Sequence, residues 1–150
     1  LVSIDDLYER DEFIRYPSKF DTVLNNLDRY VNETNCDVRV NITWSLLNIS
    51  NAREIINFFR QRGLQFSKSV NVVTKPEILN PSNHPNRDEL IEDYIHSNDE
   101  FLINLARTMM SSPFKQDELE KAIDYIKELD TIRGTKSADI FNDLEGYLLR

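Results

Sequence analysis

The sequence predicts an α/β fold in which three parallel strands alternate with two helices, followed by an all-helical segment. Apolar and polar residues alternate over Leu1 to Asp5, Val38 to Leu46 and Ser69 to Lys75, which is the period of two that a strand produces. Helix-like stretches separate these segments, and strand-helix-strand crossovers are right-handed and parallel in nearly all cases. We therefore expect both connecting helices on one side of the sheet.

The alternation gives this predicted sheet two unlike faces. The apolar face comprises Val2, Ile4, Val38, Val40, Ile42, Trp44, Val70 and Val72. The other face is polar and comprises Ser3, Asp5, Arg39, Asn41, Thr43, Ser45, Ser69, Asn71 and Lys75. Parallel sheets normally bury both faces, so a polar second face indicates either a wet, ligand-sized interior or a face that is open to solvent.

The first connection is expected to contain a loop and then a helix. The stretch from Asp6 to Tyr16 is rich in charge and is predicted to be a loop. Ser18 and Asp21 resemble an N-cap pair that opens a helix, whose apolar stripe includes Phe20 and Leu27. This helix can cover the apolar face of the sheet.

The second connecting helix has a signal at each end. Asn51 is suited to cap its start, and Gly63 stands where a helix ends in the left-handed conformation. Beyond the third strand, Pro76, Pro81 and Pro85 interrupt regular structure. We place a domain boundary there.

Residues 1–85 then form the α/β part, and residues 86–150 form a helical extension. Asn86 and Glu89 resemble a capping box at the start of the extension. Gly134 is expected to end a long helix, and a short final helix is predicted over roughly Ala138 to Leu148.

Composition limits the classes of function. The net charge of −8 opposes a phosphate backbone, so no nucleic-acid partner is expected. No apolar run reaches the roughly 20 residues that cross a bilayer, and no signal peptide opens the chain, so we expect no membrane partner and a cytoplasmic location. Cys36 is the single cysteine, and alone it can hold neither a structural zinc nor an iron-sulfur cluster. The chain also begins at Leu1, inside a predicted strand, which resembles a truncated start.

Few residues form motifs that carry chemistry. The chain has only three glycines, too few and too scattered for a glycine-rich phosphate-binding loop. His84 and His96 have no second ligand at zinc-like spacing, so no metal ligand is expected. What remains is the carboxyl end of the strands, where parallel α/β folds bind ligands. The candidates there are Ser3, Asp5, Arg15, Thr43, Ser45, Asn48 and Lys75, each of which could instead serve as a cap or as a solvated surface group.

The chemistry of these candidates favours a ligand that carries hydroxyls and a carboxylate. Hydroxyl and carboxylate side chains suit sugar hydroxyls, and the donor fork of Arg15 suits a carboxylate.

Three segments resemble radical S-adenosylmethionine enzymes of the twitch-domain-containing group. The opening Leu-Val-Ser-Ile-Asp, followed by Glu-Phe-Ile-Arg-Tyr at 12–16, is similar to the fourth barrel strand and its following helix. The strand and turn over 40–51 continue the likeness, as do Leu-Asp-Thr-Ile-Arg-Gly at 129–134 and the later Phe141 and Leu144. The resemblance covers essentially the whole chain.

This resemblance implies the C-terminal half of a partial TIM-like barrel, closed by a helical extension. By matching position, Ser3, Asp5 and Arg15 would hold the methionyl and ribose parts of S-adenosylmethionine, and Thr43 and Asn48 would lie next to the ribose or adenine. Asn41 and Lys75 would bind substrate, and no catalytic residue is assigned. These seven positions are Ser3, Asp5, Arg15, Asn41, Thr43, Asn48 and Lys75.

Two departures from the family pattern affect what this chain can do. Asp6 stands where the family usually has glycine, which affects the close approach of the turn to the cofactor. The cysteines that bind the [4Fe-4S] cluster are outside this chain. The resemblance therefore implies an intact parent that cleaves S-adenosylmethionine reductively and abstracts hydrogen from an unknown substrate, a peptide or a small molecule, with the N-terminal half as partner. This chain alone would be inactive.

Two other readings stay open. The chain could be a non-catalytic α/β binding or assembly module whose edge strand, Leu1 to Asp5, pairs with another chain. It could also be a self-contained fold that binds an acidic metabolite through Arg15, Arg39 and Lys75.

Overall fold

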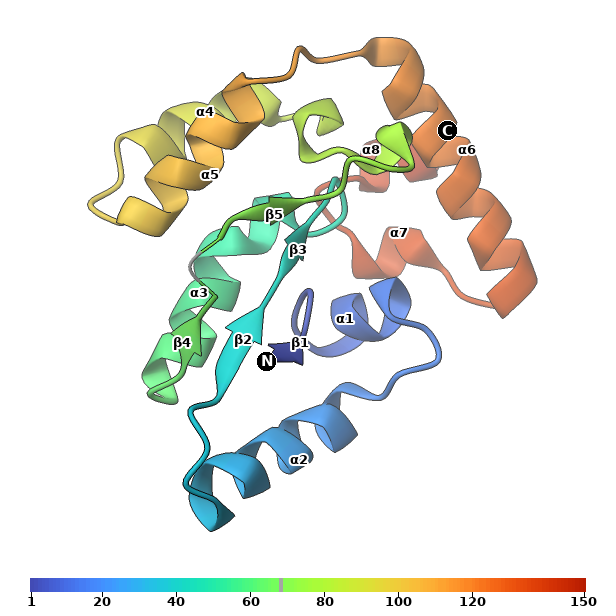
Figure 1. Cartoon of the computed structure of the whole chain (residues 1–150). Helices are drawn as coiled ribbons and strands as arrows, with labels where there is room; N and C mark the ends of the chain where they lie inside the picture. The colour runs from blue at the N-terminus through green and yellow to red at the C-terminus, as the bar shows by residue number, and fades with distance from the viewer. Residues whose placement is uncertain (68) are drawn as a thin grey trace.

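The computed structural model describes residues 1–67 and 69–150 and has the predicted α/β character, with helices dominating and short parallel strands at the centre (Figure 1). The strands are β1 (Val2–Ser3), β2 (Arg39–Asn41), β3 (Thr43–Trp44), β4 (Gln65–Phe66) and β5 (Asn71–Val72). The α-helices are α1 (Tyr8–Ile14), α2 (Phe20–Glu33), α3 (Ala52–Gln61), α4 (Arg87–Ile95), α5 (Glu100–Met110), α6 (Gln116–Arg133), α7 (Ser137–Ile140) and α8 (Glu145–Leu148). Three short 3-10 helices are η1 (Ile49–Asn51), η2 (Glu77–Leu79) and η3 (Pro81–Asn83).

The strands pair as two small parallel ladders. One ladder has the order β1-β2-β4, with Val2 opposite Val40, and the other joins β3 to β5, with Trp44 opposite Val72. The predicted second strand is thus divided at Ile42, because each half takes a different partner after α3. Within the described residues these strands form no closed barrel.

The third predicted strand differs from the expectation. Only Asn71–Val72 of the segment 69–75 is a strand, and β4, which was not predicted, pairs with β2 instead. Asn41 joins the two ladders, because its Oδ1 accepts hydrogen bonds from Ser67 Oγ at 3.1 Å and from Asn71 Nδ2 at 2.9 Å.

The apolar face of the sheet is confirmed. Ile4, Val40, Ile42 and Trp44 are buried in one core with residues of α2, α3, α4 and α5. The Trp44 ring lies 6.1 Å from that of Phe101 in α5, centroid to centroid. Helices therefore cover this face from both the α/β part and the helical extension.

A second core forms at the carboxyl end of the strands. Leu46 and Leu47, which follow β3, pack there with Phe13 of α1 and with residues of α6, α7 and α8. The Phe13 and Phe141 rings meet edge to face at 5.2 Å. The helices α6 and α7 accordingly lie across the molecule from α4 and α5 (Figure 1).

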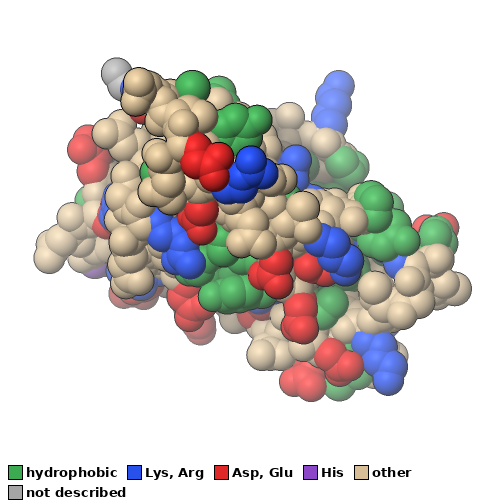
Figure 2. All heavy atoms as spheres, turned by 90° about the horizontal axis from the view of Figure 1, so that it is seen from below, with side chains coloured by type: hydrophobic (Ala, Val, Ile, Leu, Met, Phe, Trp, Pro, Cys, Tyr) green, Lys and Arg blue, Asp and Glu red, His purple; other side chains and the backbone are tan. Residues whose placement is uncertain are grey.

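The polar face is partly buried. Ser3 and Lys75 are exposed, Asn41 and Thr43 are half-buried, and Asp5 is buried. Figure 2 shows the molecule from below, with Lys and Arg side chains interspersed among Asp and Glu.

Residues 6–16 correct the sequence prediction. This stretch is not a loop, since α1 occupies Tyr8–Ile14 and buries Asp11 and Phe13. Its charges obscured a helix whose inner face is stabilised by Phe13 and by hydrogen bonds to Asp11. Tyr8, the first residue of α1, has φ +52°, which is uncommon for a residue with a side chain.

The predicted caps were only partly right. Ser18 and Asp21 do not cap α2, whose first amide, that of Phe20, donates instead to Glu12 Oε1 at 3.1 Å. Asn51 and Asn86 precede α3 and α4 as expected, but neither side chain caps its helix.

The glycine predictions were correct, and the final helix was not. Gly63 and Gly134 follow α3 and α6 with φ of +72° and +66°. The single helix expected over Ala138 to Leu148 is two short helices, α7 and α8. Phe141 and Leu144 are buried between them in the second core.

In the described part of the chain, no helix combines the length and apolar character that crossing a membrane requires.

Candidate functional site

Four of the predicted site residues meet where the chain leaves β1 and passes through β3. Asp5 Oδ2 accepts a hydrogen bond from Arg15 Nη1 at 2.7 Å, and its Oδ1 accepts one from the Thr43 amide at 2.8 Å. Asn48 Nδ2 donates to the Asp5 carbonyl at 2.6 Å. We call Asp5, Arg15, Thr43 and Asn48 the strand-end cluster.

Asn48 holds this cluster together through hydrogen bonds to the backbone. Its side chain is fully buried, and Nδ2 also donates to the Thr43 carbonyl at 3.1 Å. Its Oδ1 accepts from the Ser45 amide at 2.7 Å. Because both ends of the amide contact the backbone, Asn48 fixes the strand ends relative to each other.

The remaining predicted residues lie around the cluster. Ser3 is opposite Asn41 in the β1-β2 register, on the polar face. Asn41 is engaged by Ser67 and Asn71, as described above. Lys75 is exposed beyond β5, and no contact among the described residues connects it to the strand-end cluster.

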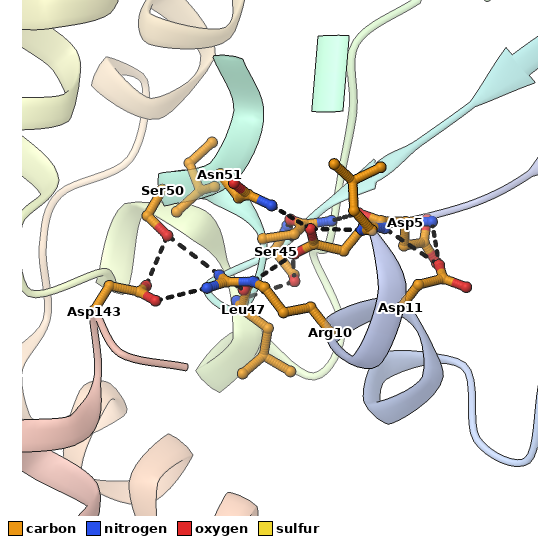
Figure 3. A network of polar contacts seen from close by, with 12 residues as sticks. Asp5, Arg10, Asp11, Ser45, Leu47, Ser50, Asn51 and Asp143 are labelled. Carbon is orange, nitrogen blue, oxygen red and sulfur yellow. Dashed lines mark hydrogen bonds and ion pairs between the residues drawn. The ribbon is translucent and has the colours of Figure 1, made fainter. Parts of the chain in front are cut away.

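Asp11 organises the turn between β1 and α1, a role that the sequence prediction of a loop missed. Asp11 Oδ1 accepts hydrogen bonds from the Asp5 amide at 2.8 Å and the Asp6 amide at 3.2 Å (Figure 3). Its Oδ2 is buried and has no hydrogen-bond partner among the described residues. Burial raises the pKa of Asp11 despite these two amide bonds.

A second polar group, centred on Arg10, adjoins the cluster (Figure 3). Arg10 Nε donates to Asp6 Oδ2 at 2.9 Å, and Nη1 donates to Asp143 Oδ1 at 2.9 Å. Its Nη2 donates to the Leu47 carbonyl at 2.6 Å. We define Asp6, Arg10, Ser50, His84 and Asp143 as the arginine hub.

Asp143 connects the C-terminal segment to the hub. Its Oδ2 accepts from Ser50 Oγ at 2.7 Å and lies 3.0 Å from Nε2 of the fully buried His84. His84 Nδ1 accepts from the Asn86 amide at 3.1 Å, which leaves Nε2 to carry the proton toward Asp143. Burial opposes ionisation of Asp143, but the hydrogen bond from His84 and the charge of Arg10 hold its pKa well below the usual range.

Asp6 is the other carboxyl of the hub, and its environment makes folding sensitive to pH. Burial, opposed by Arg10 and by a hydrogen bond from Asn51, raises the pKa of Asp6 from 3.8 to about 6. A folded pKa above the unfolded one adds stability that is fully present below pH 3.8 and is lost as the pH rises through 6. We expect Asp6 to make unfolding cost about 1 kcal/mol more at pH 5 than at pH 7.

Urea unfolding of the wild type and of Asp6→Asn at both pH values measures this effect. The two proteins should differ in their pH dependence by the stated amount, because the amide does not titrate. Identical pH dependence in both would contradict the prediction.

A cleft of about 520 Å³ opens beside the hub, between α1, α3 and the 139–143 segment. Arg10, Ser50 and Asp143 form part of its wall, and Tyr8 and Glu54 are on its lining as well. Since Arg10 already donates to Asp6, Asp143, Ser50 and Leu47, most of its hydrogen-bonding capacity is used within the protein.

Metal or cluster binding finds little support in the residues present. Among residues 1–67 and 69–150, no group of three or more His, Cys, Asp or Glu side chains could hold a metal ion. Cys36 is exposed, after α2, and is the only cysteine of the sequence. The residues of this chain therefore do not fit a [4Fe-4S] cluster.

Comparison with known proteins gives no further guide. No family model, no curated protein and no solved structure matches this chain.

Proposed function

We propose that this chain is the C-terminal half of a radical S-adenosylmethionine enzyme and contributes the cofactor- and substrate-facing side of a partial barrel. The observation that carries the proposal is the strand-end cluster, in which Asp5 after β1, Thr43 at the start of β3 and Asn48 after β3 are joined by hydrogen bonds. Helices cover the apolar face, and on the polar face Ser3 is exposed while Asn41 and Thr43 are half-buried, which supports a partial barrel whose inner face is completed by other residues of the parent.

In this proposal, Arg15 binds the methionyl carboxylate. Its side chain is 37% exposed, and within the described residues it donates one hydrogen bond, to Asp5. A guanidinium has five N–H donors, so donors remain for a carboxylate. The Asp5 carboxylate orients Arg15 and accepts a hydrogen bond from the Thr43 amide, which aligns the end of β1 with the start of β3.

Ser3 and Thr43 are the hydroxyl donors for the ribose. Both lie on the polar face, and Asn48 holds Thr43 in place through its carbonyl. Asn41 and Lys75 remain the proposed substrate contacts. S-adenosylmethionine itself, bound to a reducing cluster held by other residues of the parent, would supply the one-electron chemistry that abstracts hydrogen from a substrate.

The proposed partner is the N-terminal half of the barrel. In the described part of the chain β1 is paired on one side only, with β2, so its other edge can accept a strand. The same edge favours the second candidate function, a non-catalytic assembly module that pairs with another chain.

Titration calorimetry of this chain separates the candidates. S-adenosylmethionine should bind, and acetate and succinate at the same concentration should not. Binding of simple carboxylic acids alone would favour the acidic-metabolite reading, and no binding of any of them would favour the assembly module. An in-frame Cys-x-x-x-Cys-x-x-Cys segment upstream of Leu1 in the coding DNA would add independent support.

Replacing Arg15 with Ala should weaken S-adenosylmethionine binding by about 1.5 to 3 kcal/mol, because a charged hydrogen bond to the carboxylate is lost. Arg39→Ala is the matched control, since Arg39 is also on the polar face but pairs with Asp37. Equal affinity of the Arg15 variant and the wild type would exclude Arg15 from the site.

A further inference from the structure

The hub joins segments that are far apart in the sequence. Asp143 lies between α7 and α8, and it contacts Arg10 of α1, Ser50 of η1 and His84 after η3. Within the described residues, Asp6 and Asp143 are the two carboxylates that pair with Arg10. Their side chains are 0% and 16% exposed, and that of Arg10 is 18% exposed.

A continuous series of contacts connects Asp143 to the strand-end cluster. Arg10 holds the Asp6 carboxylate, whose Oδ1 accepts from the Leu7 amide at 2.8 Å. The adjacent residue, Asp5, contacts Arg15 through its own carboxylate. The position of the turn that carries Asp5 therefore depends on where Arg10 is held.

Apolar contacts reinforce the same link. The Arg10 guanidinium lies 4.8 Å from the centroid of the Phe141 ring, and Phe141 packs on Phe13 of α1. Both ends of α1 are thus held by the 141–143 segment. Arg133 of α6 adds a third contact, because its Nη1 donates to the Phe13 carbonyl at 2.7 Å.

We propose that Asp143 is a positioning residue, which holds Arg10, and through it the Asp6 turn, in the arrangement in which Asp5 orients Arg15 toward a ligand. The ligand part of this inference rests on the proposed function, with S-adenosylmethionine as the ligand. The coupling of the C-terminal segment to the turn is a property of the free protein.

Hydrogen exchange of the full chain tests the coupling without a ligand. Asp143→Asn keeps the shape of the side chain and loses its charge. Amide exchange in residues 5–15 should become at least tenfold faster in this variant, while exchange in α4 and α5 stays within about twofold of the wild type.

Two control variants make this outcome specific. Asp139→Asn changes an exposed carboxylate of the same segment, which has no ion pair among the described residues, and should leave exchange unchanged. Ala106→Gly, within α5, lowers the free energy of unfolding by about 1 kcal/mol. Exchange in residues 5–15 should not become faster than exchange elsewhere in this variant. Uniformly faster exchange in Asp143→Asn, or unchanged exchange in residues 5–15, would overturn the proposal.

Calorimetry with S-adenosylmethionine, at a temperature where circular dichroism shows the variant folded, tests the ligand part. The dissociation constant should rise about tenfold in Asp143→Asn and stay unchanged in Asp139→Asn. An equal dissociation constant, with residues 5–15 loosened, would overturn the positioning role. If the wild type binds no S-adenosylmethionine, the proposed function fails while the exchange result still decides the coupling.

Discussion

Arg10→Met should lower the free energy of unfolding by about 3 to 5 kcal/mol. Methionine keeps much of the apolar stem but leaves the buried carboxylates of Asp6 and Asp143 without their cation. Removing one partner of a buried ion pair is costly in this way because the remaining charge is uncompensated. The Leu47 carbonyl also loses its donor.

Urea unfolding monitored by Trp44 fluorescence measures this difference, with Arg53→Met as control. Arg53 pairs with Asp93 at the surface, where the side chains are 45% and 57% exposed. An exposed pair contributes at most about 1 kcal/mol, so this variant should be nearly as stable as the wild type. Equal losses in both variants would show that the hub is no more important than a surface pair.

Asn48→Ala is expected to lower the free energy of unfolding by about 2 to 4 kcal/mol. The change removes the donor for the Asp5 and Thr43 carbonyls and the acceptor for the Ser45 amide, all near a fully buried position. Backbone groups that are left unpaired away from water each carry a desolvation cost of about 1 to 3 kcal/mol, which relaxation partly relieves.

The matched control is Asn104→Ala on α5. Asn104 Oδ1 accepts one exposed hydrogen bond, from Arg107 of the same helix. Alanine is also a better helix former than asparagine. This variant should be neutral or slightly more stable in the same urea titration. A loss below about 1 kcal/mol in Asn48→Ala would contradict the bracing role of Asn48.

The sequence was informative where a local pattern reports a local structure. Alternation of apolar and polar residues predicted the buried positions of Ile4, Val40 and Trp44, because side-chain direction along a strand depends only on the period of two. The expectation that parallel strands end on the same side also placed Asp5, Thr43 and Asn48 together, although β1 and β3 belong to different ladders. These three residues are linked by hydrogen bonds in the structure.

Features that depend on tertiary contacts could not be predicted in this way. The two residues of β4 are too few to show a period, and α1 was hidden by its charges. Arg10 and Asp143 are 133 positions apart, so no local pattern connects them. One local signal was present, because Asp6 and Arg10 have the i, i+4 spacing of a helical ion pair.

The shared cores determine where this chain can be divided in an engineering experiment. A cut after Pro85 would remove Phe101 from beside Trp44, and it would remove the α6 to α8 residues that pack on Leu46 and Leu47. We expect the shortened product to aggregate, because large apolar surfaces would be exposed to solvent. Both cores contain residues from 1–85 and from 86–150, so we expect the two parts to fold as one cooperative unit.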